Sequence, residues 1–155
     1  MKTAKLIYDS SVVVEQLPVV RRILHPTALT DASSKALAIA VNLARQTRAE
    51  LLLAHALPPP TPIFEIESFE RPAAEAALET LVRRLSSQGI KTKRVLIKGS
   101  RPIPENIAAC AKFFSVDMIV MGTQSRRGLA RLLRGSLAGG VIKVAPCPVL
   151  VVKNR

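Results

Sequence analysis

A basic segment bounded by glycines is the part of the sequence best suited to hold an anion. It begins at Gly122, directly after an apolar run, and ends at Gly135-Ser136, where a helix-like pattern starts. Glycine permits a sharp turn at a strand end, and the first N–H groups of a helix have no intrahelical partner. Four arginines lie between these points: Arg126, Arg127, Arg131 and Arg134. Backbone donors, a helix dipole and guanidinium groups together predict a phosphate site.

The same spacing is also compatible with a solvated loop. In that interpretation the glycines serve only the turns and the arginines face water. Glycine-rich turns are frequent and unspecific, so the spacing alone does not decide between the two.

The two histidines, His25 and His55, are expected near the carboxyl ends of neighbouring strands, where they could face each other at the mouth of the site. A metal ion needs more ligands than two, and no cysteine or carboxylate stands at a suitable spacing. We therefore expect structural histidines satisfied by hydrogen bonds. No Ser–His–Asp or Cys–His arrangement and no carboxylate pair can be placed on these loops, so no catalytic residue is predicted.

The net charge of +12 is unevenly distributed along the chain. Five of the eleven acids fall between Glu65 and Glu79, whereas the stretch from Met118 to Arg155 has seven Lys or Arg and no acid. Such a surface attracts anions, among them nucleotide phosphates, nucleic acid and acidic lipid. Four Phe, one Tyr and no Trp provide few stacking platforms, so a nucleic-acid partner is not expected.

Length and composition indicate one domain with its own core, since 48% of the 155 residues are hydrophobic. No apolar run approaches the roughly 18–20 residues of a membrane span, and none resembles a signal peptide. We therefore expect a cytoplasmic protein without a membrane partner. Cys110 and Cys147 lie in apolar segments and are expected to be buried free thiols.

Apolar runs alternate with helix-periodic stretches, which is typical of βαβ units. The expected strands are Arg21–Thr27, Ala49–Leu57, Lys91–Gly99, Val116–Gly122 and Cys147–Lys153. The expected helices are Thr30–Thr47 with Thr30 or Asp31 as N-cap, Arg71–Gly89 with Pro72 in its first turn and Gly89 just past its end, Ile103–Ser115 and Gly135–Ala145. Between Pro58 and Glu70 a proline run and several acids predict a loop.

Right-handed crossovers between these elements give an α/β fold, a single open doubly wound five-stranded parallel sheet. Residues 21–155 form this Rossmann-like domain, and residues 1–20 are an N-terminal extension that could add a hairpin at an edge. The strand Lys91–Gly99 alternates polar and apolar residues and should lie near an edge. Gly139 and Gly140 cost about 1 kcal/mol each in a helix. They either permit close packing against the sheet or a neighbouring subunit, or are tolerated drift, which is the simpler interpretation.

At this point the sequence resembles the universal stress protein family. The resemblance rests on three segments, "ILHPTALTDASSKALAIAVNLA", "AELLLAHAL" and "VDMIVMGTQSRRGLARLLRGSLAGGVIKVAPCPVLVVK". It implies a five-stranded sheet of the adenine nucleotide α-hydrolase-like kind, with strand order 3-2-1-4-5. The family pattern of Gly, two residues, Gly, nine residues, then Gly-Ser or Gly-Thr is present here, with Ser125 at the second glycine.

Carried over by position, the resemblance implies a nucleotide site made of three groups of residues. The phosphates and ribose would contact Gly122, Ser125, Gly135 and Ser136, with a helix-start amide from Leu137. The base would be bordered by Pro26, Thr27, Ala28 and Ala56. Met121, Arg126 and Arg127 complete the expected set.

Two of these positions depart from the nucleotide-binding pattern. Ser125 adds a Cβ and a hydroxyl where the backbone should approach a phosphate, although the hydroxyl could itself donate to an oxygen. Ala28 stands where ATP-binding members usually carry an Asp that contacts the nucleoside, and Asp31 nearby is expected to cap a helix instead. Losing one such hydrogen bond costs about 0.5–1.5 kcal/mol. Binding of ATP or ADP, with Mg²⁺ if bound, is therefore left open.

Three functions follow from this sequence. The first is a stress-response protein that binds an adenine nucleotide weakly as a signal, with at most slow ATP hydrolysis and with loops around Pro58–Glu70 and Gly122–Arg134 that close on the ligand. The second is a nucleotide-free interaction module whose face Arg126–Arg134 docks a partner protein. The third and weaker one is nonspecific nucleic-acid binding. The resemblance also implies a homodimer that pairs through Cys147–Lys153.

Overall fold

The computed structural model describes residues 19–58, 66–123 and 136–153 of the chain. Their elements, in order, are β1 Arg22–Pro26, the 3₁₀ helix η2 Asp31–Ser33, α1 Ser34–Thr47, β2 Glu50–Ala56, α2 Ile66–Ser87, β3 Thr92–Ile97, α3 Ile103–Phe113, β4 Met118–Thr123, α5 Leu137–Val144 and β5 Val149–Lys153. The hairpin expected from residues 1–20 lies almost wholly outside the described residues, and Val19 and Val20 belong to no element.

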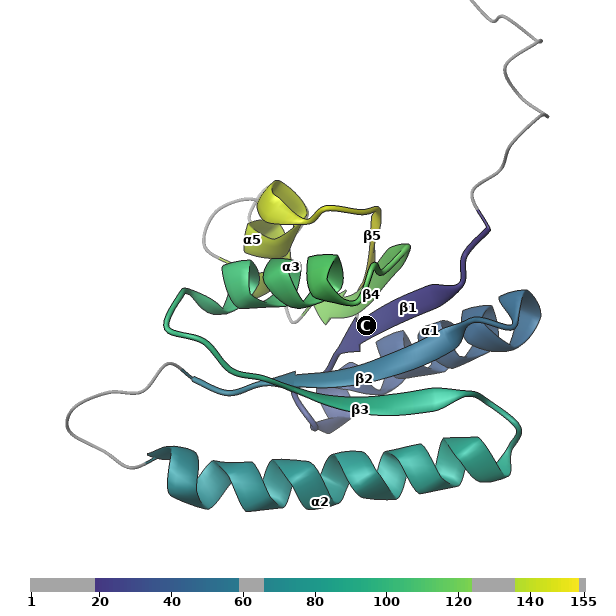
Figure 1. The fold of residues 1–155 in the computed structure, drawn as a ribbon, viewed down its shortest axis with the longest axis horizontal. Helices are drawn as coiled ribbons and strands as arrows, with labels where there is room; N and C mark the ends of the chain where they lie inside the picture. The colour runs from purple at the N-terminus through teal and green to yellow at the C-terminus, as the bar shows by residue number, and fades with distance from the viewer. Residues whose placement is uncertain (1–18, 59–65, 124–135, 154–155) are drawn as a thin grey trace, which may run out of the picture.

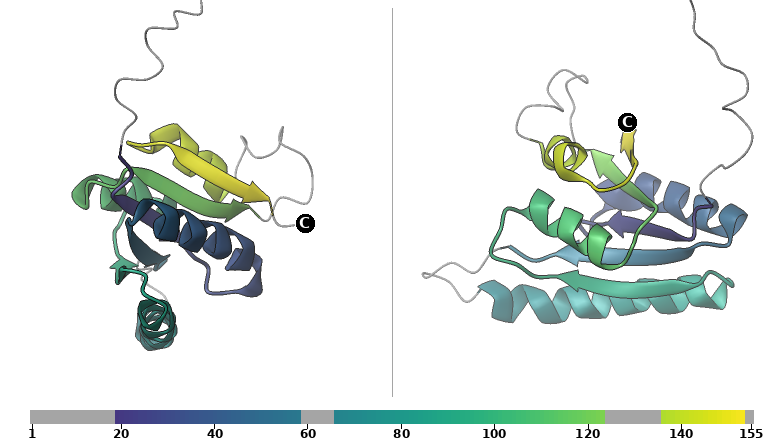
Figure 2. Two further views of the ribbon diagram at one scale, coloured as in Figure 1. Left: turned by 90° about the vertical axis from the view of Figure 1, so that its right-hand side faces the viewer. Right: turned by 45° about the horizontal axis from the view of Figure 1, so that its top comes forward.

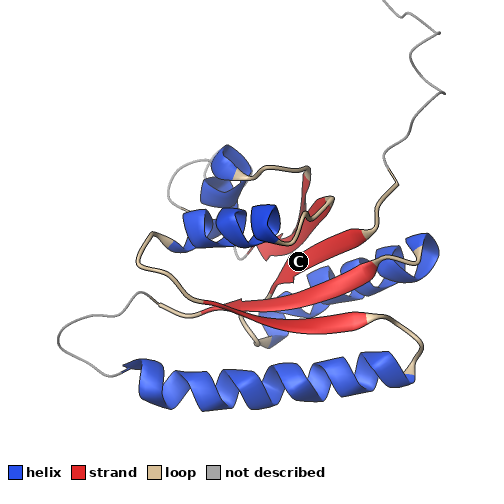
Figure 3. Cartoon of the chain, in the orientation of Figure 1, coloured by secondary structure: helices blue, strands red, loops and turns tan. Residues whose placement is uncertain are grey.

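The five described strands form one parallel sheet in the order β3-β2-β1-β4-β5, so the predicted fold class and strand order are confirmed (Figures 1 and 3). Strand β3 lies at one edge, as its alternating pattern predicted, and β5 lies at the other. The register of β1 against β2 extends over five residue pairs, from Arg22–Glu50 to Pro26–Ala54. The register of β1 against β4 covers only Ile23–Met118 and Leu24–Ile119. The two central strands therefore pair least where they approach their carboxyl ends.

Helices cover both faces of the sheet, with α1 and α2 on one face and α3 and α5 on the other (Figure 2). Successive residues of a strand point to opposite faces, so each strand contributes to both cores. Ile23 packs toward α1 and α2, whereas Leu24 packs toward α3 and α5. In α1 the buried residues are Ala36, Ala40 and Ala44, spaced four apart, and their small side chains let the helix lie close to the strands.

The start of α2 differs from the prediction. The helix begins at Ile66, so Ile66–Glu70 is helical rather than part of a loop, and Pro72 lies inside the helix instead of in its first turn. The expected loop is thus shorter, and its residues 59–65 lie outside the described part of the chain.

The start of the first helix also differs from the prediction. Thr30 holds the N-cap position of η2 with an extended backbone, as predicted, but its side chain makes no capping bond. Asp31 begins η2 instead of capping, and α1 follows from Ser34. A short 3₁₀ turn therefore replaces the predicted first turn of the helix.

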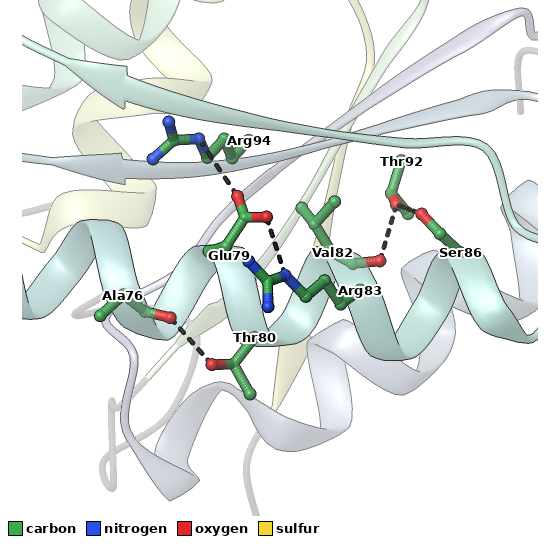
Figure 4. Close-up of polar contacts among 8 residues, drawn as sticks. All are labelled: Ala76, Glu79, Thr80, Val82, Arg83, Ser86, Thr92 and Arg94. Carbon is green, nitrogen blue, oxygen red and sulfur yellow. Dashed lines mark hydrogen bonds and ion pairs between the residues drawn. The ribbon is translucent and has the colours of Figure 1, made fainter.

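Polar contacts hold α2 to the edge strand β3 (Figure 4). Glu79 accepts from Arg83 Nε at 3.1 Å and pairs with Arg94 Nε of β3 at 3.4 Å. Such exposed pairs contribute little energy each but keep the two elements in register. The helix ends at Ser87, and Gly89 lies just past its end as predicted, with a φ of 78°.

The contact between α5 and α3 explains one of the two helical glycines. A Cβ placed on Gly140 would lie 2.6 Å from Cγ of Pro104, closer than carbon atoms tolerate. Drift is therefore the wrong interpretation for Gly140. The close neighbour is the first turn of α3, neither the sheet nor another subunit.

Candidate functional site

Some of the residues expected to bind a ligand lie at or near the carboxyl ends of β1, β2 and β4. Thr27 follows β1, and Gly122 lies near the end of β4. Because Leu24 pairs with Ile119, Thr27 and Gly122 are each three residues further along neighbouring strands. Helix η2 contacts β4, and α5 packs on both β4 and β5. The crossover that leaves β1 leads to β2 and the one that leaves β4 leads to β5, on opposite sides of the β1–β4 pair, and this switch in strand order is where open α/β sheets place ligands.

Hydrogen bonds to β2 and within the turn fix the segment after β1. The Thr27 N–H donates to the Ala54 carbonyl at 2.8 Å, and the Thr27 carbonyl accepts from His55 Nδ1 at 2.9 Å. The Thr27 hydroxyl accepts from the Leu29 N–H at 3.0 Å. Leu29 has a φ of 57°, a left-handed conformation that is uncommon for leucine. The turn therefore has a defined shape, set by hydrogen bonds within it and to β2.

Ala28 is exposed in this turn, and its N–H donates to Ser33 Oγ at 3.2 Å. An alanine side chain offers a ligand no polar group. Pro26 is half-buried at the end of β1, and Ala56, the last residue of β2, is half-buried against the α3–α5 core.

The amino end of α5 presents backbone donors as expected. Ser136 is the N-cap, because its Oγ accepts from the Gly139 N–H at 3.0 Å and its carbonyl accepts from the Gly140 N–H at 2.9 Å. The N–H groups of Leu137 and Ala138 come before the first intrahelical bond, so helix geometry gives them no carbonyl partner within the helix. The Leu137 side chain is exposed. This end of α5 can therefore donate to an anion through its backbone.

The remaining predicted site residues lie in the core, at the end of β4 or outside the described residues. Met121 is buried in the core beneath α3 and α5, so its side chain does not face a ligand. Gly122 is half-buried at the strand end. Ser125, Arg126, Arg127 and Gly135 lie outside the described residues, as does the rest of the Arg126–Arg134 face.

The two histidines hold backbone carbonyls and not each other. His25 is fully buried, and its Nδ1 lies 2.8 Å from the Val120 carbonyl oxygen of β4. A carbonyl only accepts, so both histidines must carry hydrogen on Nδ1. Burial lowers the pKa of His25, which keeps its ring neutral. Its Nε2 is then a buried acceptor without a partner in the described part of the chain, so the expectation of a fully satisfied histidine is only half correct.

The site region shows no metal centre within residues 19–58, 66–123 and 136–153, where no three metal-binding side chains come together. Both cysteines are free thiols; Cys110 is buried as expected, whereas Cys147 is only half-buried. Burial raises the pKa of the Cys110 thiol to about 11 and also raises the pKa of Cys147. Among the helices in these same ranges, none has the length and apolar character to cross a membrane.

Comparison with known proteins identifies a family with a matching sequence. Residues 20–153 match the model of the universal stress protein family. The chain is 33% identical over 143 residues to universal stress protein MJ0531 of Methanocaldococcus jannaschii, covering 86% of this chain and 82% of that protein. It is also 33% identical over 129 residues to a universal stress protein of Thermus aquaticus, covering 80% and 92% of the two chains.

Solved structures share the fold. Universal stress protein UspA from Lactobacillus plantarum superposes with a TM-score of 0.72 at 25% identity, covering 88% of this chain and 99% of that one. A universal stress protein in complex with cAMP gives 0.69 at 21% identity, covering 89% and 100%. The protein from Archaeoglobus fulgidus in complex with dAMP gives 0.68 at 22% identity, covering 88% and 100%.

Proposed function

Because this chain belongs to the universal stress protein family, we propose that it binds an adenine nucleotide weakly at the carboxyl edge of its sheet. The nucleotide would act as a signal in a stress response in the cytoplasm, not as a substrate for rapid turnover. The observation that carries this proposal is the arrangement around the switch in strand order. There η2, in the turn after β1, contacts β4, and α5, which begins with free backbone donors, packs on the same strand.

The ligand class follows from the chemistry of this edge and of similar proteins. The backbone N–H groups of Leu137 and Ala138 suit a phosphate. The half-buried Pro26 and Ala56 offer apolar surface of the kind a base needs. Structures of the same fold contain cAMP and dAMP, which share an adenine base and one phosphate. A triphosphate would carry Mg²⁺ on its own oxygens, since the described residues offer the ion no ligand cluster.

Binding is expected to be weak because the turn after β1 lacks a side-chain hydrogen bond to the nucleoside. Ala28 is exposed there and has no polar atom beyond Cβ. The loss corresponds to about 0.5–1.5 kcal/mol, or about tenfold in affinity. Fast hydrolysis would also need a base or nucleophile aimed at the phosphates. The hydroxyl oxygens of Thr27 and Ser136 at this edge already accept from the Leu29 and Gly139 N–H groups.

The assembly that fits this chain is a homodimer through β5. Strand β5 is the edge of the sheet next to β4, and its Leu150 is 40% exposed. An edge strand with an exposed apolar side chain is a surface that a second copy can cover. Native mass spectrometry of the purified protein would report a dimer and any retained nucleotide in one measurement.

A nucleotide-free interaction module is the second candidate. The exposed Ala28 favours it, because the position that should recognise a nucleoside has no polar side chain. Its docking face, Arg126–Arg134, belongs to the part of the chain that the structure does not describe.

Thermal unfolding with and without millimolar Mg-ATP separates the two candidates. A ligand that binds only the folded state must raise the midpoint, so nucleotide binding predicts an upward shift. Adenine recognition further predicts a larger shift with ATP than with GTP. No shift with either nucleotide would exclude the proposal and favour the interaction module.

The variant Ala28→Asp sharpens this test. It restores a carboxylate at an exposed position and should raise ATP affinity about tenfold, measured by isothermal titration calorimetry. Ala73→Asp is the matched control, because it adds the same charge at an exposed position of α2. Equal affinities for both variants would show that the Ala28 position does not contact the nucleoside.

A further inference from the structure

Two side-chain hydrogen bonds cross the candidate site from strand to strand. His55 at the end of β2 donates from Nδ1 to the Thr27 carbonyl after β1, and His25 of β1 donates from Nδ1 to the Val120 carbonyl of β4. His25 and His55 lie on the same face of the sheet, because their pairing partners Leu53 and Leu96 both pack on the α1–α2 side. These two bonds, here called the histidine clamp, connect β2, β1 and β4.

The clamp acts where the backbone ladder stops. The register of β1 against β4 ends at Leu24 and Ile119, one residue before His25 and Val120. The next residue of β1 is Pro26, which has no N–H to donate to a neighbouring strand. The His25 ring supplies the missing donor to the Val120 carbonyl. The spacing of β1 and β4 at the edge that carries Thr27 and Gly122 therefore depends on a side chain.

Packing alone does not explain a histidine at this position. His25 is fully buried, and its Nε2 has no hydrogen-bond partner within the described ranges. A buried acceptor without a partner destabilises a protein, and an apolar residue would avoid that cost. The Nδ1 bond to Val120 is the favourable contact that accompanies this burial.

We infer that His25 and His55 are positioning residues, whose Nδ1–H groups hold the Val120 and Thr27 carbonyls and so set the spacing of the nucleotide-binding edge. The inference rests on the proposed function for its ligand, but the clamp itself is a property of the folded chain. Neither histidine needs to touch the nucleotide. Each acts through the backbone that the nucleotide would contact.

Substitution by asparagine or leucine separates the clamp from simple packing. The Nδ2 of asparagine replaces the Nδ1 donor of histidine, whereas leucine has no donor. We expect His25→Leu to weaken Mg-ATP binding about tenfold and His25→Asn to retain it. The control is Leu78→Val, a change in the core of the same face that should leave affinity unchanged within about twofold. Equal Mg-ATP affinity of His25→Leu and the parent protein would overturn the inference.

Two measurements without nucleotide keep the inference testable if the proposed function fails or if His25→Leu does not fold. Two-bond ¹H–¹⁵N spectra of the parent protein at pH 7 should show the Nδ1–H tautomer for both rings. An Nε2–H tautomer at His25 would overturn the clamp. Amide exchange at Gly122 should be faster in His55→Leu and His25→Leu than in the corresponding asparagine variants. Absence of nucleotide binding in both the parent and Ala28→Asp would end the proposed function, and the tautomer and the exchange rates would still decide the clamp.

Discussion

The close contact between Gly140 of α5 and Pro104 of α3 makes a quantitative prediction for Gly140→Ala. In an exposed helix this change would stabilise the protein by about 1 kcal/mol through helix propensity. Here the new Cβ would lie 2.6 Å from Pro104 Cγ and 3.0 Å from its Cβ. Overpacking of this kind costs about 1–3 kcal/mol. We therefore expect a net loss of up to about 2 kcal/mol in the free energy of unfolding.

The rigidity of the partner supports this magnitude. A proline ring cannot rotate away as a long side chain would, and the first turn of α3 is fixed by bonds from the Glu105 and Asn106 N–H groups to the Pro102 carbonyl, at 3.0 and 3.1 Å. Relief of the contact requires one helix to shift against the other. Both helices belong to the same core, so such a shift would disturb Ile107 and Val141.

A double-mutant cycle in urea, followed by circular dichroism, tests this reasoning. Pro104→Ala removes Cγ, so in that background Gly140→Ala should be neutral or slightly stabilising. The expected coupling is about 1–3 kcal/mol. A Gly140→Ala protein at least as stable as the parent, or an equal loss in both backgrounds, would refute the contact as the cause.

Two further predictions concern titrating groups. Burial lowers the pKa of His25 below its usual value, so below about pH 6.5 the unfolded chain binds more protons than the folded one and the free energy of unfolding falls as the pH drops. His25→Asn should lose less free energy of unfolding between pH 7 and pH 5 than the parent protein, as measured by urea unfolding at both pH values. An equal loss in the two proteins would contradict this assignment. The Cys110 thiol, with its pKa raised to about 11, should react with iodoacetamide at pH 8 far more slowly than Cys147 in the native protein. Peptide mass spectrometry after timed labelling checks this, and equal rates would show that Cys110 is not protected.

The sheet could be predicted from the sequence because its strands are short apolar runs between helix-periodic segments. The start of the long helix α2 is predicted less well from the sequence. The helix carries Pro72 in its interior, and its first turn follows a run of prolines and acids, so local composition indicated a loop up to Glu70. Tertiary packing of Leu78 and Leu85 stabilises this helix, and no local pattern in Ile66–Glu70 reveals that contribution.

The sequence predicts where the candidate site lies along the chain, but it does not predict the hydrogen bonds made there. The amides at the start of α5 follow from a Gly-Ser pair ahead of a helical pattern. The bonds from His25 to Val120 and from His55 to Thr27 join residues 95 and 28 positions apart, so no local signal announces them. A histidine within an apolar strand and directly before a proline was the one available hint. Its partner could be known only after the strands were placed side by side.

The hydrogen bonds that fix the turn after β1 affect the thermodynamics of ligand binding. Thr27 uses its N–H, its carbonyl and its hydroxyl oxygen within the protein, and the Ala28 N–H is bonded to Ser33. The turn is therefore already ordered before a ligand binds, and no residue of the turn has to fold during association. Binding against the turn should therefore show a small heat-capacity change and a single kinetic phase.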